Sequence, residues 1–125
     1  MNTATHPGFS SALNQLWIKF LPQIQERLES LETSAQACAQ NRLSYRQCQQ
    51  AHDAAHKLAG SLGTFGLTRG TVLAHDLEIL FSAFDPPIAD DAEQLAKLVA
   101  ELRALIESHW AQAAAFPHLP SATHG

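Results

Sequence analysis

The sequence predicts an all-α protein, an antiparallel up-and-down four-helix bundle with a short extra helix at its N-terminus. Leu and Ala dominate the aliphatic residues while Val, Ile and Thr are few, which favours helix over sheet. Apolar residues also recur every three or four positions through most of the chain. Short connections separate these periodic segments, and helices joined in this way pack most simply as an antiparallel bundle.

The chain has 125 residues, of which 46% are hydrophobic, and this is enough for one domain with its own core. We predict that residues 1–9 are a flexible N-terminus and that residues 10–112 form the bundle. Residues 116–125 have no hydrophobic period and contain two prolines. We therefore predict that residues 113–125 are a disordered tail or a linker.

The first periodic segment extends from Ser10 to about Ala39. Its apolar face consists of Leu13, Trp17, Phe20, Ile24, Leu28, Leu31, Ala35 and Cys38. Pro22 lies inside this segment and removes the backbone hydrogen bond to the carbonyl of Ile18. We therefore expect a short first helix, followed by a long second helix that begins near Leu21.

The next helix is expected to begin at Tyr45, because Ser44 is a good N-cap residue, and to continue into the region of Gly63. Glycines at positions 60, 63 and 66 weaken it progressively towards its end.

Two more helices follow in the remaining periodic sequence. Thr68 can cap the first, which ends before the segment Asp85-Pro86-Pro87. Its apolar face carries Val72, Leu73, Leu77, Leu80, Phe81 and Phe84. The last helix is expected to be capped by Asp90 or Asp91 and to reach about Trp110. Its apolar residues are Leu95, Leu98, Leu102, Leu105 and Ile106.

The charge balance argues against nucleic acid as a partner. The chain has 8 Lys and Arg against 12 Asp and Glu, a net charge of −4, so it has no broad basic surface for a phosphate backbone. No stretch approaches the roughly 20 apolar residues of a membrane-spanning helix, and residues 1–10 lack the features of a signal peptide. We expect a cytoplasmic protein without a membrane partner.

The two cysteines do not suggest a disulfide or a metal site. Cys38 and Cys48 lack CxxC spacing, and in a reducing cytosol they are expected to be small, partly buried side chains. We expect no cofactor.

One histidine is predicted to face away from the core. When residues 45–65 are placed on a helix at about 100° per residue, one side is apolar and carries Ala51, Ala54, Ala55, Leu58, Leu62 and Phe65. His56 lies on the opposite side. Within about 60° of it lie Tyr45, Gln49, His52, Asp53, Ala59, Gly60 and Gly63.

The surroundings of His56 suit phosphoryl transfer between proteins. Gly60 and Gly63 each cost a helix about 0.8–1 kcal/mol relative to Ala, which indicates that space is kept clear beside the imidazole. An unhindered imidazole on a rigid helix can approach a phosphoaspartate in a partner's cleft. Near neutral pH a useful fraction of histidine is unprotonated and nucleophilic. Lys57 is the nearest positive charge for the phosphoryl oxygens.

These residues resemble a known family pattern. The segments His56–Ser61 (HKLAGS) and Gly63–Leu67 (GTFGL), followed by Leu77-Glu78, resemble the pattern H-x-L-K-G-(S/A), a small residue, glycine and later L-E. This is the pattern of the histidine phosphotransfer (HPt) family of two-component phosphorelays. The Gly-Thr-Phe-Gly portion is similar to the phosphotransfer domains of chemotaxis-type kinases.

The resemblance implies a four-helix bundle whose exposed His56 accepts a phosphoryl group and exchanges it with the receiver domain of a response regulator. A histidine kinase is the other implied partner, and the chain would be a monomeric phosphoryl carrier without kinase activity of its own, since it has no phosphate-cradling loop. The phosphoryl- or partner-binding residues are expected to be Lys57, Gly60, Gly63, His52 and Ala59.

The chain departs from the family pattern at one position. Ala59 stands where the family has a lysine, and Lys57 directly follows the histidine instead. Lys57 lies about 100° around the helix from His56. Glu78 is interpreted as a helix surface or capping contact, and Arg42, Arg46 and Arg69 as a candidate basic rim for an acidic receiver cleft.

Two alternatives remain open. His52 and His56 have the i, i+4 spacing of a helical metal site, and His75 or Asp76 could supply a third ligand. The segment differs from HExxH in having Asp53 in place of glutamate. The other alternative is a helical bundle that binds partners without transferring a phosphoryl group.

Overall fold

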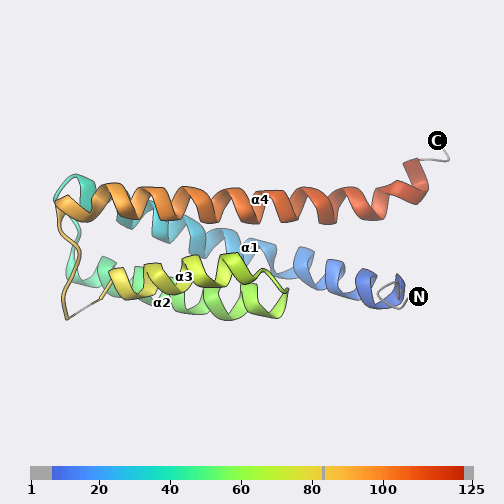
Figure 1. Ribbon diagram of the computed structural model, residues 1–125, viewed down its shortest axis with the longest axis horizontal. Helices are drawn as coiled ribbons and strands as arrows, with labels where there is room; N and C mark the ends of the chain where they lie inside the picture. The colour runs from blue at the N-terminus through green and yellow to red at the C-terminus, as the bar shows by residue number, and fades with distance from the viewer. Residues whose placement is uncertain (1–6, 83, 123–125) are drawn as a thin grey trace.

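The structure is a computed structural model that describes residues 7–82 and 84–122. It contains four α-helices and one short 3₁₀ helix, with no strand among the described residues. These elements are α1 (Pro7–Ala39), α2 (Tyr45–Thr64), α3 (Thr68–Leu80), η2 (Ala89–Asp91) and α4 (Ala92–Ala122). Successive helices alternate in direction, so the start of α1 and the end of α4 lie at the same end of the molecule (Figure 1). The predicted all-α four-helix bundle is confirmed.

The prediction of a short separate N-terminal helix was wrong, because α1 is one helix with Pro22 inside it. An interior proline costs about 3 kcal/mol or more. The residues around it, Trp17, Leu21, Ile24 and Leu28, are all buried, and each such burial contributes about 1.5–3 kcal/mol. Burial of this continuous apolar face outweighs the lost hydrogen bond. Pro22 itself lies on the exposed side.

The two ends of α2 are both capped by local hydrogen bonds. The Ser44 side chain accepts a hydrogen bond from the backbone N–H of Gln47 at 3.0 Å, as the sequence predicted. At the other end, the N–H of Leu67 donates to the carbonyl of Leu62, and Gly66 adopts φ +74°. This is a Schellman motif, which requires the left-handed conformation that glycine adopts without strain.

The limits of α3 differ from those predicted. Thr68 is the first helical residue and not its cap, because the turn that ends α2 already extends to Leu67. The helix ends at Leu80, one residue before the fully buried Phe81. Phe84 therefore lies beyond α3 and is fully exposed, which corrects its predicted place on the core face. Val72, at 44% exposure, is likewise outside the core.

Two buried cysteines attach the connection between α3 and α4 to the bundle. The thiol of Cys48 donates to the carbonyl of Ser82, and that of Cys38 donates to the carbonyl of Ile88. Burial raises the pKa of both thiols, and both are free. Their predicted role as small, partly buried side chains is confirmed, with burial more complete than expected.

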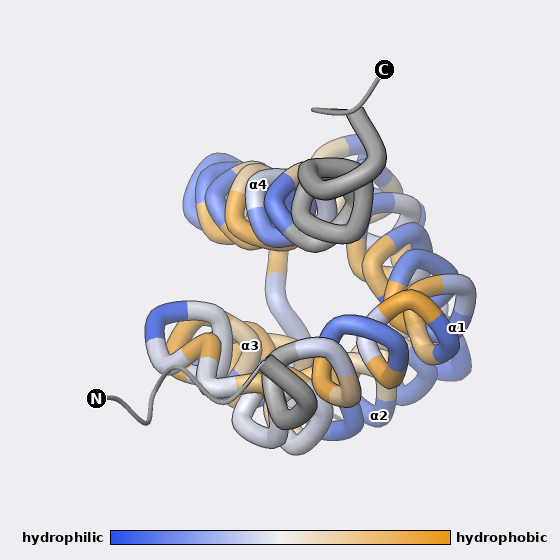
Figure 2. The backbone as a smooth tube through the Cα atoms, turned by 90° about the vertical axis from the view of Figure 1, so that its right-hand side faces the viewer, coloured by the Kyte–Doolittle hydropathy of each residue, from blue (hydrophilic) through white to orange (hydrophobic). Residues whose placement is uncertain are grey.

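The core fills the space between all four helices. Figure 2 looks along the bundle and shows α1 and α4 beside each other, with α2 and α3 completing the ring. The largest fully buried side chains are Trp17, Phe81, Ile24, Leu28, Leu31, Leu58, Leu62, Leu73, Leu77, Leu95, Leu102 and Ile106. Phe20, predicted on the core face, is 37% exposed. Arg103 of α4 forms a bidentate ion pair with Glu32 of α1 and joins these two helices.

The helices α1 and α4 extend beyond the limits predicted for these helices. The helix α1 begins at Pro7, where the fixed φ of proline suits a first helical position. The helix α4 continues from Trp110 to Ala122, and its Ala-rich segment 111–115 favours helix. The assignment of residues 113–125 to a tail or linker stays a prediction. Residues 1–6 and 123–125 lie outside the described part of the chain. Within the described part, no helix is long and apolar enough to cross a membrane.

Candidate functional site

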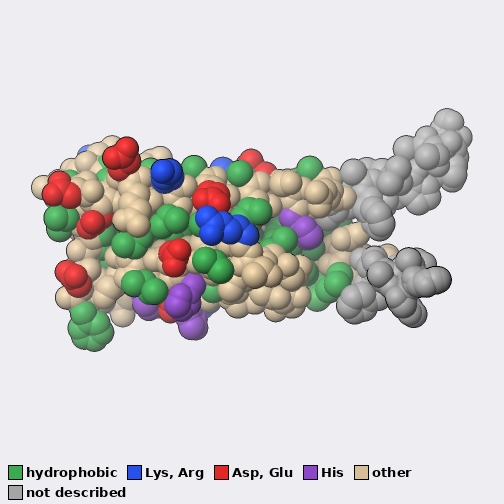
Figure 3. All heavy atoms as spheres, in the orientation of Figure 1, with side chains coloured by type: hydrophobic (Ala, Val, Ile, Leu, Met, Phe, Trp, Pro, Cys, Tyr) green, Lys and Arg blue, Asp and Glu red, His purple; other side chains and the backbone are tan. Residues whose placement is uncertain are grey.

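The helix α2 presents His56 on the outer surface of the bundle. The side chain of His56 is 71% exposed, whereas Ala55 and Leu58, on the other side of the same turn, are fully buried. The sequence predicted this orientation from the position of His56 opposite the apolar face. A group of histidine side chains gathers at the lower edge of the molecule in Figure 3, where α2 and α3 lie side by side.

Glu78 of α3 holds the His56 ring. The Nδ1 atom of His56 lies 2.9 Å from Oε2 of Glu78, whose side chain is only 18% exposed. A carboxylate can only accept, so Nδ1 carries the proton and donates it to Glu78. In the neutral ring Nε2 then has a free lone pair. In that neutral form the exposed side chain keeps one ring nitrogen available, while Nδ1 is anchored to the protein.

The interpretation of Glu78 as a surface or capping contact missed this interaction. Glu78 is 22 residues from His56 in the sequence, so no spacing rule within one helix connects them. The signal that could have found it was the Leu77-Glu78 pair, which is part of the family pattern.

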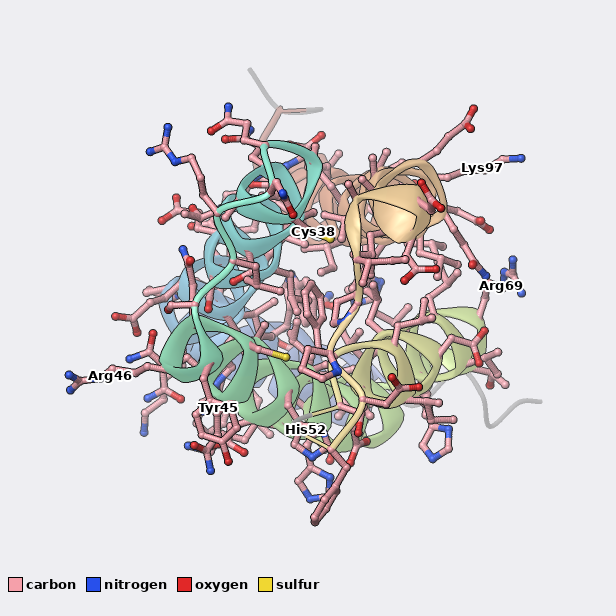
Figure 4. All side chains as sticks on the ribbon, turned by 90° about the vertical axis from the view of Figure 1, so that its left-hand side faces the viewer. Cys38, Tyr45, Arg46, His52, Arg69 and Lys97 are labelled. Atoms are coloured by element: carbon pink, nitrogen blue, oxygen red, sulfur yellow. The ribbon has the colours of Figure 1, made fainter. Side chains whose placement is uncertain are left out.

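His52 lies one turn before His56 and contacts the same residue of α3. Its Nδ1 atom lies 2.9 Å from the backbone carbonyl oxygen of Glu78, and its Nε2 atom lies 3.9 Å from Oε2 of Glu78. Figure 4 shows His52 at the edge of the bundle, where α2 and α3 meet. His52 was predicted to bind the phosphoryl group or the partner, yet its best contact is with the protein's own backbone.

Packing within the chain does not require glycine at position 60 or 63. A Cβ atom added at Gly60 would meet nothing within 4 Å, and one added at Gly63 would make an ordinary contact of 3.5 Å with Oγ1 of Thr71. Both residues are exposed. Alanine would therefore fit at both positions and favour the helix, and the interpretation that these glycines keep space clear for another molecule stays a prediction.

Lys57 and Ala59 have different environments. Lys57 is exposed, and its predicted contact with the phosphoryl group or the partner stays a prediction. Ala59 is half-buried at the contact between α2 and α3, where its carbonyl accepts a hydrogen bond from Oγ1 of Thr71 at 3.3 Å. Ala59 is therefore a packing residue, and no positive charge stands where the family has its lysine.

The predicted basic rim does not surround His56. Arg69 forms an ion pair with Glu101 of α4 at 2.9 Å. Arg46 and Arg69 point to opposite sides of the molecule in Figure 4. Arg42 lies in the turn between α1 and α2, where its backbone N–H donates to the carbonyl of Ala37. The three arginines do not form a continuous surface.

The residues suggested for a metal site do not come together. Within the described part of the chain, no group of three His, Cys, Asp or Glu side chains is placed to hold a metal ion. His75 and Asp76 are both exposed on α3. Nδ1 of His52 and Nδ1 of His56 are each directed to an oxygen of Glu78.

Comparisons with known proteins indicate a family for this chain. A family profile described as "Hpt domain" matches residues 15–111. Protein RcaC from Microchaete diplosiphon is 39% identical over 66 residues, which cover 53% of this chain and 10% of that protein. The chain thus matches only about a tenth of the length of this relative. No solved structure matched the chain.

Proposed function

Because this chain belongs to the Hpt domain family, whose members carry phosphoryl groups on a histidine in phosphorelays, we propose that it accepts a phosphoryl group on His56 and exchanges it with the aspartate of a response-regulator receiver domain. Hpt domains are phosphoryl carriers rather than kinases, and they interact with histidine kinases and response regulators. The single observation that carries the proposal is the hydrogen bond from Nδ1 of the exposed His56 to the carboxylate of Glu78.

This hydrogen bond leaves the lone pair of Nε2 available for in-line attack on a phosphoryl group. The lone pair of Nε2 attacks the phosphorus of the phosphoaspartate, so that an N–P bond forms while the P–O bond to the aspartate breaks and its carboxylate leaves. The ring becomes more positive as this happens. Glu78, at 2.9 Å from Nδ1, stabilises that charge and keeps the proton on Nδ1. The reverse reaction returns the phosphoryl group to an aspartate.

The surface around His56 suits a protein partner. Gly60 and Gly63 leave the next two turns of α2 without bulk, so the edge of a receiver cleft can approach the ring. Lys57 is the nearest exposed cation on α2, and we assign it an electrostatic contribution to binding the phosphoryl group or the partner. We place the exchange in the cytoplasm, with the chain acting as a monomer that needs no cofactor, nucleic acid or membrane.

The proposal predicts that the wild-type chain becomes labelled when it is incubated with a phosphorylated receiver domain or with a small-molecule phosphodonor. The label is expected to be lost in acid and retained in alkali, because a phosphoramidate behaves in this way and an acyl phosphate does not. ATP alone is the control and is expected to give no label. Absence of label with every donor, or an acid-stable label, would contradict the proposal and favour an interaction module that does not transfer.

A further inference from the structure

The last turn of α3 contains the residue that holds His56. The helix ends at Leu80, so the carbonyls of residues 77–80 lack the usual partner within α3. The N–H of Phe81 donates to the carbonyl of Leu77. The next carbonyl, that of Glu78, is 2.9 Å from Nδ1 of His52. Because a carbonyl only accepts, His52 donates from Nδ1 and thereby caps the end of α3 from the neighbouring helix.

We propose that His52 is a positioning residue for the phosphotransfer reaction, acting through the backbone of Glu78 to set the position from which the Glu78 carboxylate holds His56. This inference rests on the function proposed above. It assigns His52 a role inside the protein, in place of the expected contact with the phosphoryl group or the partner.

The geometry supports attachment of Glu78 at two points. His52 and His56 are one turn apart on the same face of α2, and they bind the main chain and the side chain of Glu78 respectively, each at 2.9 Å. One turn earlier on α2, Cys48 donates to the carbonyl of Ser82. Residues 48, 52 and 56 thus connect α2 to the end of α3 and the residues that follow it. Helix ends fray readily, and these contacts hold this one in register.

His52 is poorly placed to accept a phosphoryl group itself. Its Nδ1 atom donates a hydrogen bond to the carbonyl of Glu78, so only Nε2 could accept, and Nε2 lies 3.9 Å from the carboxylate oxygen Oε2 of Glu78. A phosphoryl group on Nε2 would meet this negative charge at close range. Its side chain is also less exposed than that of His56, at 39% against 71%.

The test compares three substitutions at position 52. His52→Ala removes the donor. His52→Asn keeps it, because the amide nitrogen of asparagine occupies the place of Nδ1. His52→Gln keeps the polarity but puts its amide where Nε2 lies. Two quantities are measured in the full chain: the fraction of His56 protonated on Nδ1, from the ¹⁵N shifts of its ring, and the rate of phosphoryl transfer from a phosphorylated receiver.

We expect His52→Ala and His52→Gln to lower the Nδ1-protonated fraction of His56 and to slow transfer about fivefold, while His52→Asn stays close to wild type in both. His75→Ala is the matched control, because it removes an exposed histidine of α3 that forms no ion pair among the described residues. If His52→Ala unfolds the chain, the comparison of His52→Asn with His52→Gln decides.

Wild-type ring shifts in both His52→Ala and His52→Gln would overturn the positioning role, whatever happens to the rate. Equal effects of asparagine and glutamine would also overturn it, because the Nδ1 donor would then be irrelevant. If the ring shifts change as expected but the wild-type chain never accepts a phosphoryl group, the positioning role stands and the proposed function fails.

Discussion

Phosphoryl transfer is expected to be abolished when His56 is replaced by glutamine, with a rate at least about a thousandfold lower. The reason is that the amide of glutamine is not nucleophilic and cannot form the N–P bond that the imidazole forms. Glutamine remains polar and helix-compatible, and the His56 side chain is 71% exposed, so the fold should be unaffected. The measurement is label incorporation from a phosphorylated receiver domain. Thermal unfolding of the same sample checks that the bundle is intact.

The matched control is His75→Gln, which removes an exposed histidine on the neighbouring helix. It is expected to accept label as wild type does. The chain has seven histidines, so the comparison separates the proposed acceptor from the general availability of imidazole. If His56→Gln becomes labelled as fast as wild type, the phosphoacceptor lies elsewhere in the chain.

The second large effect is expected for Glu78→Gln, which should slow transfer roughly a hundredfold. The carboxylate can only accept a hydrogen bond from Nδ1 of His56, at 2.9 Å. An amide in its place can instead donate to Nδ1, which moves the ring proton to Nε2 and blocks the nucleophile. The amide also lacks the negative charge that stabilises the ring as the N–P bond forms. The measurement is the single-turnover rate of transfer from the receiver.

Glu101→Gln is the control for the loss of a carboxylate. Glu101 lies on α4 and pairs with Arg69, and both side chains are well exposed, so removing this pair costs little stability and does not touch His56. Its transfer rate is expected to equal that of wild type. Transfer by Glu78→Gln at the wild-type rate would show that the hydrogen bond to Nδ1 has no part in the reaction.

Hydrophobic periodicity, together with capping residues, predicted the segments that form the four helices, although it divided α1 in two. It predicted α2 from its Ser44 cap and its apolar face, and it placed the buried residues of α4 at the correct spacing. It failed where a local signal competed with tertiary packing. Pro22 indicated a break, but the buried face on both sides of it keeps α1 continuous. Phe84 matched the apolar spacing of α3, but that helix ends before it.

Only those features of the candidate site that depend on α2 alone could be predicted from the sequence. The direction of His56 followed from the phase of α2, and the open space at Gly60 followed from residue type. The partners of the ring come from another helix, and an isolated helix pattern contains no information about which residues face each other across a contact. For this reason neither the carboxylate contact of Glu78 nor the backbone contact of His52 was predicted.

The most direct test of the account is to locate the phosphoryl group on the phosphorylated wild-type chain by ³¹P and ¹⁵N NMR of its histidine rings. The hydrogen bond between Nδ1 and Glu78 predicts a single phosphohistidine, at His56, with phosphorus bonded to Nε2 and the proton kept on Nδ1. Phosphorus on Nδ1 of His56, or on any other histidine, would contradict the account.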